Sequence, residues 1–167
     1  LRGLAIDPVG RRLYWGQYNQ AFDDWDLFIM ALDPPYATSR LTGDMEWGVN
    51  VGGLAIDSER GVVYWADNGG DIHRIGIDGK GQALWKASVC ASNLYFDGPA
   101  ESLYATCNNN IVRIDLNTKA VTTQIVDDNP VHGIAVDPVR GVAYWTSANS
   151  SSTGTQVRKG NLPPATP

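Results

Sequence analysis

The sequence predicts an all-β fold built from a unit that occurs four times, and three observations support this. A short apolar run that ends in aspartate recurs at spacings of 50, 40 and 40 residues. A tyrosine follows each of these aspartates seven residues later, giving the pairs Asp7 and Tyr14, Asp57 and Tyr64, Asp97 and Tyr104, and Asp137 and Tyr144. The 18 Gly and 9 Pro in 167 residues favour many turns over long helices. Such a repeat is typical of the four-stranded antiparallel blades of a β-propeller.

Each repeat begins with two strands joined by a tight turn. The run Gly-Leu-Ala-Ile-Asp at residues 53–57 is short and apolar, and the turn signal Ser-Glu-Arg-Gly follows it. The next run, Val-Val-Tyr-Trp at residues 62–65, is rich in β-branched and aromatic residues, as strands are. Alternation sends Tyr64 and Trp65 to opposite faces of the strand. We therefore expect each ring to pack against a different neighbouring sheet.

Two further strands complete the predicted blade. The third is expected at residues 27–32, 72–77, 111–116 and 155–160, and the fourth at residues 39–41, 82–86 and 121–126. The last repeat shows no fourth strand. We expect propeller blades over residues 1–161, with repeats near residues 1–50, 51–90, 91–130 and 131–161. Residues 162–167 are expected to form a Pro-rich linker or tail.

The second strands carry a family resemblance. The segments GLAID…LYW and GLAID…VYWAD resemble the YWTD repeats of the low-density-lipoprotein receptor class B type, and the resemblance covers nearly the whole chain. The motif's Asp is kept only at Asp67 and its Thr only at Thr106 and Thr146, so the chain resembles a diverged member, or one whose blades are coupled more loosely. The repeat-defining core positions are Tyr14, Trp15, Tyr64, Trp65, Asp67, Tyr104, Tyr144 and Trp145.

This resemblance implies a ring of six blades, in which the motif's Asp helps to tie neighbouring blades together. About four blades are present, so a partial propeller is expected, and a closed four-bladed ring is the alternative. The remaining blades would lie in the same protein or in a second chain. The sequence starts at Leu1 inside a predicted blade, so we expect a processed product or a segment of a longer polypeptide. An open end would expose a flat apolar blade face, which favours association.

Charge and composition disfavour several functions. The net charge is −5 and no Lys/Arg cluster is present, so nucleic acid is not an expected partner. The acidic balance slightly favours a basic or cationic partner, but solubility is the preferred explanation. No run approaches the roughly 18 apolar residues of a membrane span, and nothing resembles a signal peptide.

Two features favour a location outside the cytosol. Cys90 precedes the first strand of the third repeat and Cys107 ends its second strand, so antiparallel pairing places both at the same end of a hairpin. We expect a disulfide between them, and two free thiols are the alternative. Asn149-Ser150-Ser151 is an N-glycosylation sequon in a polar loop. The sequence therefore predicts an extracellular or cell-surface glycoprotein.

A candidate partner-binding patch lies in the loops of one propeller face. The first repeat carries ten extra residues, 17–26, after its second strand, and the loop at residues 42–47 should lie nearby. Exposed aromatic side chains commonly anchor interfaces. In the alternative interpretation Phe22, Trp25 and Trp47 only cap the core, and no ordered calcium-binding motif is present at Asp23, Asp24 and Asp26. The residues of the candidate patch are Phe22, Asp23, Asp24, Trp25, Glu46 and Trp47.

No catalytic, cofactor-binding or metal-binding residue is predicted. The sequence has no GxSxG, no HExxH and no Gly-rich phosphate loop. The repeated strand-end aspartates are better explained by turn chemistry than by a metal site, because a metal site would break the repeat symmetry. His73 and His132, the only histidines, are expected in no shared pocket.

The predicted function is a non-enzymatic, extracellular protein-interaction module, a propeller segment that contributes to a larger extracellular or cell-surface assembly. A receptor-like ligand-binding propeller is the first alternative, and a metal-dependent propeller hydrolase is the second. Protein partners are expected, and no cofactor is. The lipoprotein-binding role of the namesake family is not carried over, because its ligand-binding residues are not identifiable here.

Overall fold

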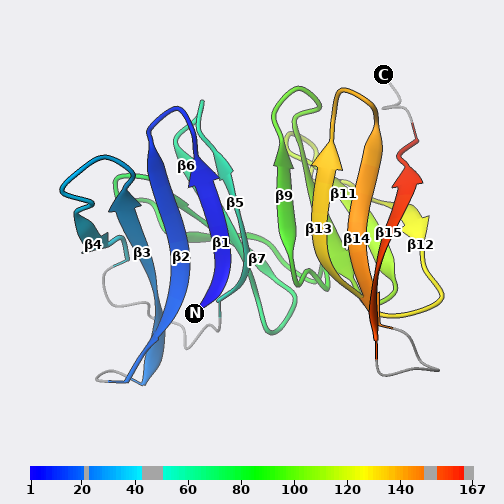
Figure 1. Ribbon diagram of the computed structural model, residues 1–167, viewed down its shortest axis with the longest axis horizontal. Coiled ribbons are helices and arrows are strands. Elements are labelled where there is room, and N and C mark those ends of the chain that lie inside the picture. Colours follow the sequence, from blue (N-terminus) through cyan, green and yellow to red (C-terminus); the bar gives the residue numbers. More distant parts are fainter. Residues whose placement is uncertain (21–22, 43–50, 149–153, 164–167) are drawn as a thin grey trace.

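The computed structural model describes residues 1–20, 23–42, 51–148 and 154–163, and within these ranges every regular element is a β-strand (Figure 1). Three residues of the candidate partner-binding patch and the predicted glycosylation site lie outside the described residues: Phe22, Glu46, Trp47 and Asn149. The first half of the chain forms β1 (Arg2–Asp7), β2 (Arg12–Asn19), β3 (Asp24–Ala31), β4 (Thr38–Arg40), β5 (Val51–Asp57), β6 (Val62–Asp67), β7 (Ile72–Gly76) and β8 (Ala83–Lys86). The second half forms β9 (Leu94–Asp97), β10 (Ser102–Cys107), β11 (Asn110–Asp115), β12 (Val121–Val126), β13 (Val131–Asp137), β14 (Val142–Ala148) and β15 (Thr155–Asn161).

These strands form four antiparallel sheets, each a meander in chain order, which we call blades 1 to 4. Blades 1, 2 and 3 have four strands each, β1 to β4, β5 to β8 and β9 to β12, whereas blade 4 has the three strands β13, β14 and β15. The first strands β1, β5, β9 and β13 lie toward the middle of the molecule, with blade 1 in blue on one side and blade 4 in orange and red on the other (Figure 1). The structure confirms the predicted all-β propeller architecture.

In blades 2 and 3 the tyrosine and the residue after it face different neighbouring blades, as the alternation predicted. We call the face that carries Tyr14, Tyr64, Tyr104 or Tyr144 the Tyr face, and the face that carries the next residue the Trp face. Three apolar clusters form the core, and each joins the Tyr face of one blade to the Trp face of the next. Tyr14 and Leu27 pack with Leu54 and Trp65, for example, and Tyr104 packs with Trp145. The core therefore lies between the blades rather than inside any one sheet.

The repeated aspartates shape the turns that follow the first strands. The Asp7 carboxylate accepts hydrogen bonds from the backbone N–H groups of Val9 (3.0 Å) and Gly10 (2.9 Å). Asp57, Asp97 and Asp137 each accept one from the residue three positions later, at 2.9, 3.2 and 3.0 Å. This turn chemistry is the role that the sequence predicted for these carboxylates.

The first repeat differs from its prediction. Its ten extra residues were expected in a loop, but most of them lengthen the hairpin: residues 17–19 belong to β2, and β3 already begins at Asp24. Tyr18 pairs with Trp25, and Asn19 pairs with Asp24. Side chains alternate along this extension as they do in the rest of β2 and β3, and the strand pairing continues further than in the hairpins of the other blades. The loop prediction was therefore wrong for most of the segment.

Candidate interaction face

One face of the propeller is formed by the turns after the second strands and by the links between blades, and we call it the loop face. It includes the N-terminal end of β1, near the bottom of the molecule in Figure 1. A hollow of about 690 Å³ opens there, beside the ends of the first strands. Its polar lining comes from all four blades and their links, and includes Arg2, Asp67, Asn68, Ser92, Asn93, Asn108 and His132.

Asp67, the one position that keeps the motif's aspartate, organises the wall of this hollow. Its carboxylate accepts a hydrogen bond from the backbone N–H of Asp71 (2.9 Å) and lies 2.9 Å from His73 Nε2. The His73 ring in turn stacks on Trp65, with centroids 5.3 Å apart. These contacts all lie within blade 2. The resemblance implied a contact that ties neighbouring blades, but the described contacts of Asp67 fix its own hairpin instead.

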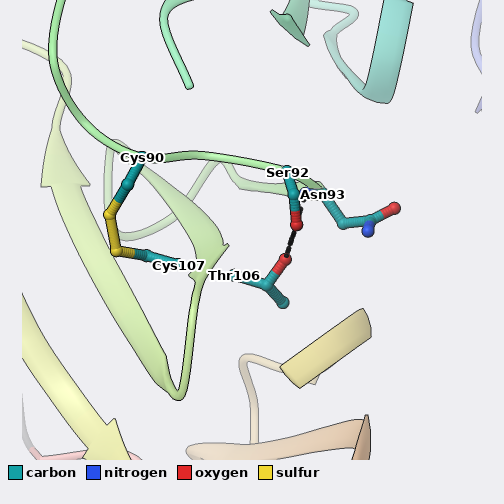
Figure 2. The surroundings of a disulfide bond; sticks show 5 residues. All are labelled: Cys90, Ser92, Asn93, Thr106 and Cys107. Carbon is teal, nitrogen blue, oxygen red and sulfur yellow. Dashed lines mark hydrogen bonds between the residues drawn. A yellow bond between two sulfur atoms is a disulfide. The ribbon is translucent and has the colours of Figure 1, made fainter. Parts of the chain in front are cut away.

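The threonine of the YWTD motif has a different structural role, which is visible at Thr106 (Figure 2). Its hydroxyl oxygen accepts a hydrogen bond from the Asn93 backbone N–H (3.0 Å), and it lies 2.8 Å from the Ser92 hydroxyl. Thr146 repeats this contact by accepting from the Gly133 N–H at 2.9 Å. The threonine thus fixes the first strand of blades 3 and 4, and the Asn93 amide points away from Thr106 (Figure 2).

The link at residues 88–93 connects blades 2 and 3 at the edge of the hollow. The Gly53 N–H donates to the Ser92 carbonyl (2.7 Å), and the Ala91 N–H donates to the Gly70 carbonyl (3.0 Å). Gly70 has a φ of +82°, and a Cβ there would lie 2.5 Å from the Cα of Cys90, so only glycine allows this approach. A disulfide joins Cys90 to Cys107 across a Cα–Cα distance of 5.1 Å and anchors the link to blade 3 (Figure 2).

The part of the candidate partner-binding patch that the structure describes lies on the extended hairpin of blade 1. The Tyr18 hydroxyl donates to the Asp23 carboxylate, and the Tyr18 ring meets Trp25 edge-on at 6.0 Å. The Arg2 guanidinium lies 5.4 Å from the centre of the Trp25 ring. Trp25 is partly buried against the core cluster between blades 1 and 2, as the core-capping alternative expected, and a partner-binding role for it stays a prediction.

The acidic side chains of the extended hairpin have separate environments. Asp24 caps its neighbour by accepting from the Trp25 N–H (2.7 Å), and Asp26 is buried beside Arg40 at 3.1 Å. Asp26 also accepts from the Thr42 hydroxyl at 3.3 Å. Asp26 is therefore a structural residue. Of the candidate patch residues that the structure describes, Asp23 is exposed, and the exposed Tyr18 lies beside it. The described residues contain no group of three His, Cys, Asp or Glu side chains that could hold a metal ion.

Sequence reasoning missed the buried polar contacts of Asp127. Asp127, in the link between blades 3 and 4, accepts hydrogen bonds from Trp145 and Arg158. Its partners lie 18 and 31 residues away along the chain, so no local spacing indicated them. Sequence reasoning also missed that Arg2 and His132 line the hollow, because the hollow forms only when the first strands of the four blades come together.

Comparisons with known proteins agree with this geometry. Protein cueball of Drosophila grimshawi is 33% identical over 161 residues, which cover 87% of this chain and 25% of that protein. The chain thus spans a quarter of the length of that relative. A crystal structure of a nidogen/laminin complex, whose matching chain is a YWTD-type β-propeller, superposes with a TM-score of 0.75 at 18% identity, over 97% of this chain and 66% of that one. In fold, the chain is a diverged YWTD-like β-propeller.

This YWTD-like propeller also resembles an enzyme in fold. A gluconolactonase of Xanthomonas campestris superposes with a TM-score of 0.69 at 10% identity, over 86% of this chain and 52% of that one. At such identities the likeness concerns the fold alone. No protein-family model matches the chain. The described residues of the YWTD-like propeller form no helix able to cross a membrane.

Proposed function

We propose that this chain is a non-enzymatic, extracellular protein-interaction module, a propeller segment that contributes through its loop face to a larger extracellular or cell-surface assembly. The observation that carries the proposal is the polar hollow of about 690 Å³ on that face. Its walls are fixed by Asp67, by Thr106 and by the Cys90–Cys107 disulfide, while Arg2, Asn68 and His132 remain exposed. Exposed side chains on a rigid rim suit recognition of a protein surface.

Three further points support this proposal. The nidogen/laminin structure shows that a propeller of similar fold occurs in a complex with another protein. The disulfide and the Asn149 sequon favour an oxidising compartment. The exposed Trp face of blade 1 and Tyr face of blade 4 offer contact surfaces to further blades, in the same or in another chain. Tyr18 and Asp23 extend the loop face beyond the hollow, together with Phe22, Glu46 and Trp47 as further candidates.

A receptor-like role is the second candidate, because the hollow could hold a side chain inserted from a ligand. A metal-dependent hydrolase has less support. Its repeated candidate ligands, the strand-end aspartates, bond the backbone of their own turns. Their positions follow the repeat, whereas a catalytic metal centre needs a convergent ligand set.

The proposal is tested by capture of partners from the extracellular fraction with matched variants of the purified, disulfide-bonded chain. Arg2→Ala with His132→Ala alters the hollow, and Asp23→Ala with Tyr18→Phe alters the extended hairpin. Glu59→Ala with Val139→Ala changes exposed side chains in the turns after first strands, away from the loop face. We expect the loop-face variants to lose partners that the turn variant keeps. Equal capture by all variants, with the fold intact by circular dichroism, would exclude the loop face as the binding surface.

A further inference from the structure

The turn between β6 and β7 carries the only asparagine in the sequence that a glycine follows. Asn68 and Gly69 are both exposed there, and both line the hollow on the loop face. An Asn-Gly step is chemically reactive, because glycine has no Cβ to keep its backbone nitrogen away from the side chain of the preceding residue. Attack of that nitrogen on the carboxamide carbon of the asparagine closes a succinimide ring.

The backbone of this turn is held on both sides of Gly69. The Gly70 N–H donates to the Asp67 carbonyl at 3.1 Å, and the Asp71 N–H donates to the Asp67 carboxylate at 2.9 Å. In the described part of the chain no acceptor holds the Gly69 N–H itself. The attacking nitrogen therefore gives up no hydrogen bond within the protein when it reacts.

The carboxamide of Asn68 faces a cation from the neighbouring blade. The Arg2 guanidinium, in β1 of blade 1, donates a hydrogen bond to Asn68 Oδ1 at 3.4 Å. The same guanidinium lies 5.4 Å from the centre of the Trp25 ring, which helps to position it. During the attack Asn68 Oδ1 takes up negative charge, and a cation beside that oxygen stabilises the charge. The fold therefore adds a stabilising group to a step that is already reactive in the sequence.

We propose that Asn68 is a modification site, at which the chain converts its own asparagine to aspartate and isoaspartate with Arg2 as the stabilising cation. The Gly69 nitrogen forms a bond to Asn68 Cγ and releases its proton, while the bond from Cγ to the amide nitrogen breaks and the amide group leaves as ammonia. Water, the only co-reactant, then opens the ring at either of its carbonyl carbons. Opening at one carbon gives aspartate. Opening at the other gives isoaspartate, in which the main chain runs through the former side chain.

The reaction changes the charge at the point where blades 1 and 2 meet on the hollow. The titratable side chains that line the hollow belong to Arg2, Asp67 and His132. A carboxylate at residue 68 adds one negative charge to this lining and pairs with the Arg2 guanidinium. Where the loop face binds a partner, as proposed above, this pairing should weaken the contacts that Arg2 makes. The modification itself does not depend on that function.

Incubation of the purified, disulfide-bonded chain at neutral pH and physiological temperature, followed by peptide mass spectrometry, tests the proposal. We expect the peptide with Asn68 to gain about 1 Da and to yield isoaspartate. Asn108 is the matched control, because it is exposed on the same hollow in the corresponding turn of blade 3, but Asn109 follows it. Its peptide should keep its mass over the same period.

Gly69→Ala tests the attacking nitrogen. Gly69 is outside the left-handed φ region, so alanine suits its backbone, and the new Cβ would lie 3.2 Å from Asp67 Oδ1, which a small shift of that carboxylate relieves. The conversion of Asn68 should slow by about tenfold or more, because the methyl group obstructs the approach of the nitrogen. Conversion at the wild-type rate in this variant would contradict the proposed reaction.

Arg2→Ala separates the contribution of the fold from that of the local sequence. Arg2 is exposed, so the variant should keep the fold, and in the folded chain it should convert Asn68 several-fold more slowly than the wild type. In urea the two chains should convert equally fast, because these residues are 66 positions apart in the sequence. The proposal is wrong if Asn68 keeps its amide in the folded chain while it converts in urea, or if folded Arg2→Ala converts as fast as the wild type. Neither readout involves a partner, so failure of the proposed function would leave both results unchanged.

Discussion

The indole Nε1 of Trp145 donates a 2.6 Å hydrogen bond to the carboxylate of Asp127, and this contact ties the link between blades 3 and 4 to β14. The same carboxylate accepts from the Arg158 guanidinium and the Asn129 N–H, both at 2.9 Å, and from the Ser147 hydroxyl at 3.2 Å. The Asp127 side chain is 0% exposed. One buried charge therefore holds the link and two strands of blade 4 in place.

Asp127→Asn should destabilise the fold by about 3 kcal/mol, because the new amide group would face several donors and leave Arg158 without its buried partner. Chemical denaturation followed by tryptophan fluorescence measures the change. The neighbouring Asp128 is exposed, so Asp128→Asn should alter the free energy of unfolding by less than about 0.5 kcal/mol. Similar values for the two variants would show that the Asp127 contacts contribute little.

The same carboxylate predicts a dependence of stability on pH. Burial alone would raise the pKa of Asp127, but hydrogen bonds from Trp145, Asn129 and Ser147 outweigh it and hold the pKa below the ordinary value of 3.8. The unfolded chain therefore binds this proton more readily than the folded one. The stabilisation is present above pH 3.8 and is lost as the pH falls through the lower folded pKa.

The difference in the free energy of unfolding between the wild type and Asp127→Asn should accordingly shrink on acidification from about pH 6 to about pH 2.5. Urea unfolding at several pH values measures this difference. Other carboxylates, such as Asp7, titrate in both proteins and cancel in the comparison. A difference that stays constant over this range would mean that the Asp127 pKa is the same in the folded and unfolded chains.

The disulfide predicts a second change in stability. It closes a separation of 17 residues, and removal by Cys90→Ser with Cys107→Ser should cost about 3 kcal/mol. Hydrogen exchange should also increase in the link at residues 88–93, whose backbone bonds join blades 2 and 3. If both thiols of the native protein react with an alkylating agent before reduction, the disulfide is absent and this prediction fails.

The sequon predicts a modification. If the protein passes through a secretory compartment, Asn149 should carry a glycan, so enzymatic deglycosylation should lower the intact mass of the native protein. Asn149→Gln should remove the same mass and leave the unfolding midpoint nearly unchanged. A native mass that deglycosylation does not alter would remove one of the two arguments for an extracellular location.

The repeat made most of the fold predictable. The Tyr64-Trp65 pair alone required a sheet covered on both faces, and the fixed offset from Asp57 located the tight turn between the first two strands. These are local signals, since alternation and turn chemistry act over a few residues. The extended hairpin was not predictable in the same way. Polar residues such as Gln17 and Asp24 favour a loop, and only pairing across the hairpin makes them strands.

The site was less predictable than the fold, because it is assembled from several blades. Asp67 was expected to contact another blade from the resemblance, yet its described partners Asp71 and His73 lie in its own hairpin. The role of Asp127 depends on Trp145 and Arg158 meeting it in space. Neither contact can be recognised from the spacing of residues in the sequence. The proximity of Cys90 to Cys107 can, because it follows from the geometry of a single hairpin.

Site-specific photo-cross-linking tests most directly whether the loop face carries the function. A photoreactive amino acid in place of His132, which is exposed on the rim of the hollow, should form protein cross-links in the native extracellular setting. The same group in place of Glu59, which is exposed in a turn after a first strand, should form few. Cross-links at Glu59 and none at His132, from two folded variants, would contradict the proposed function.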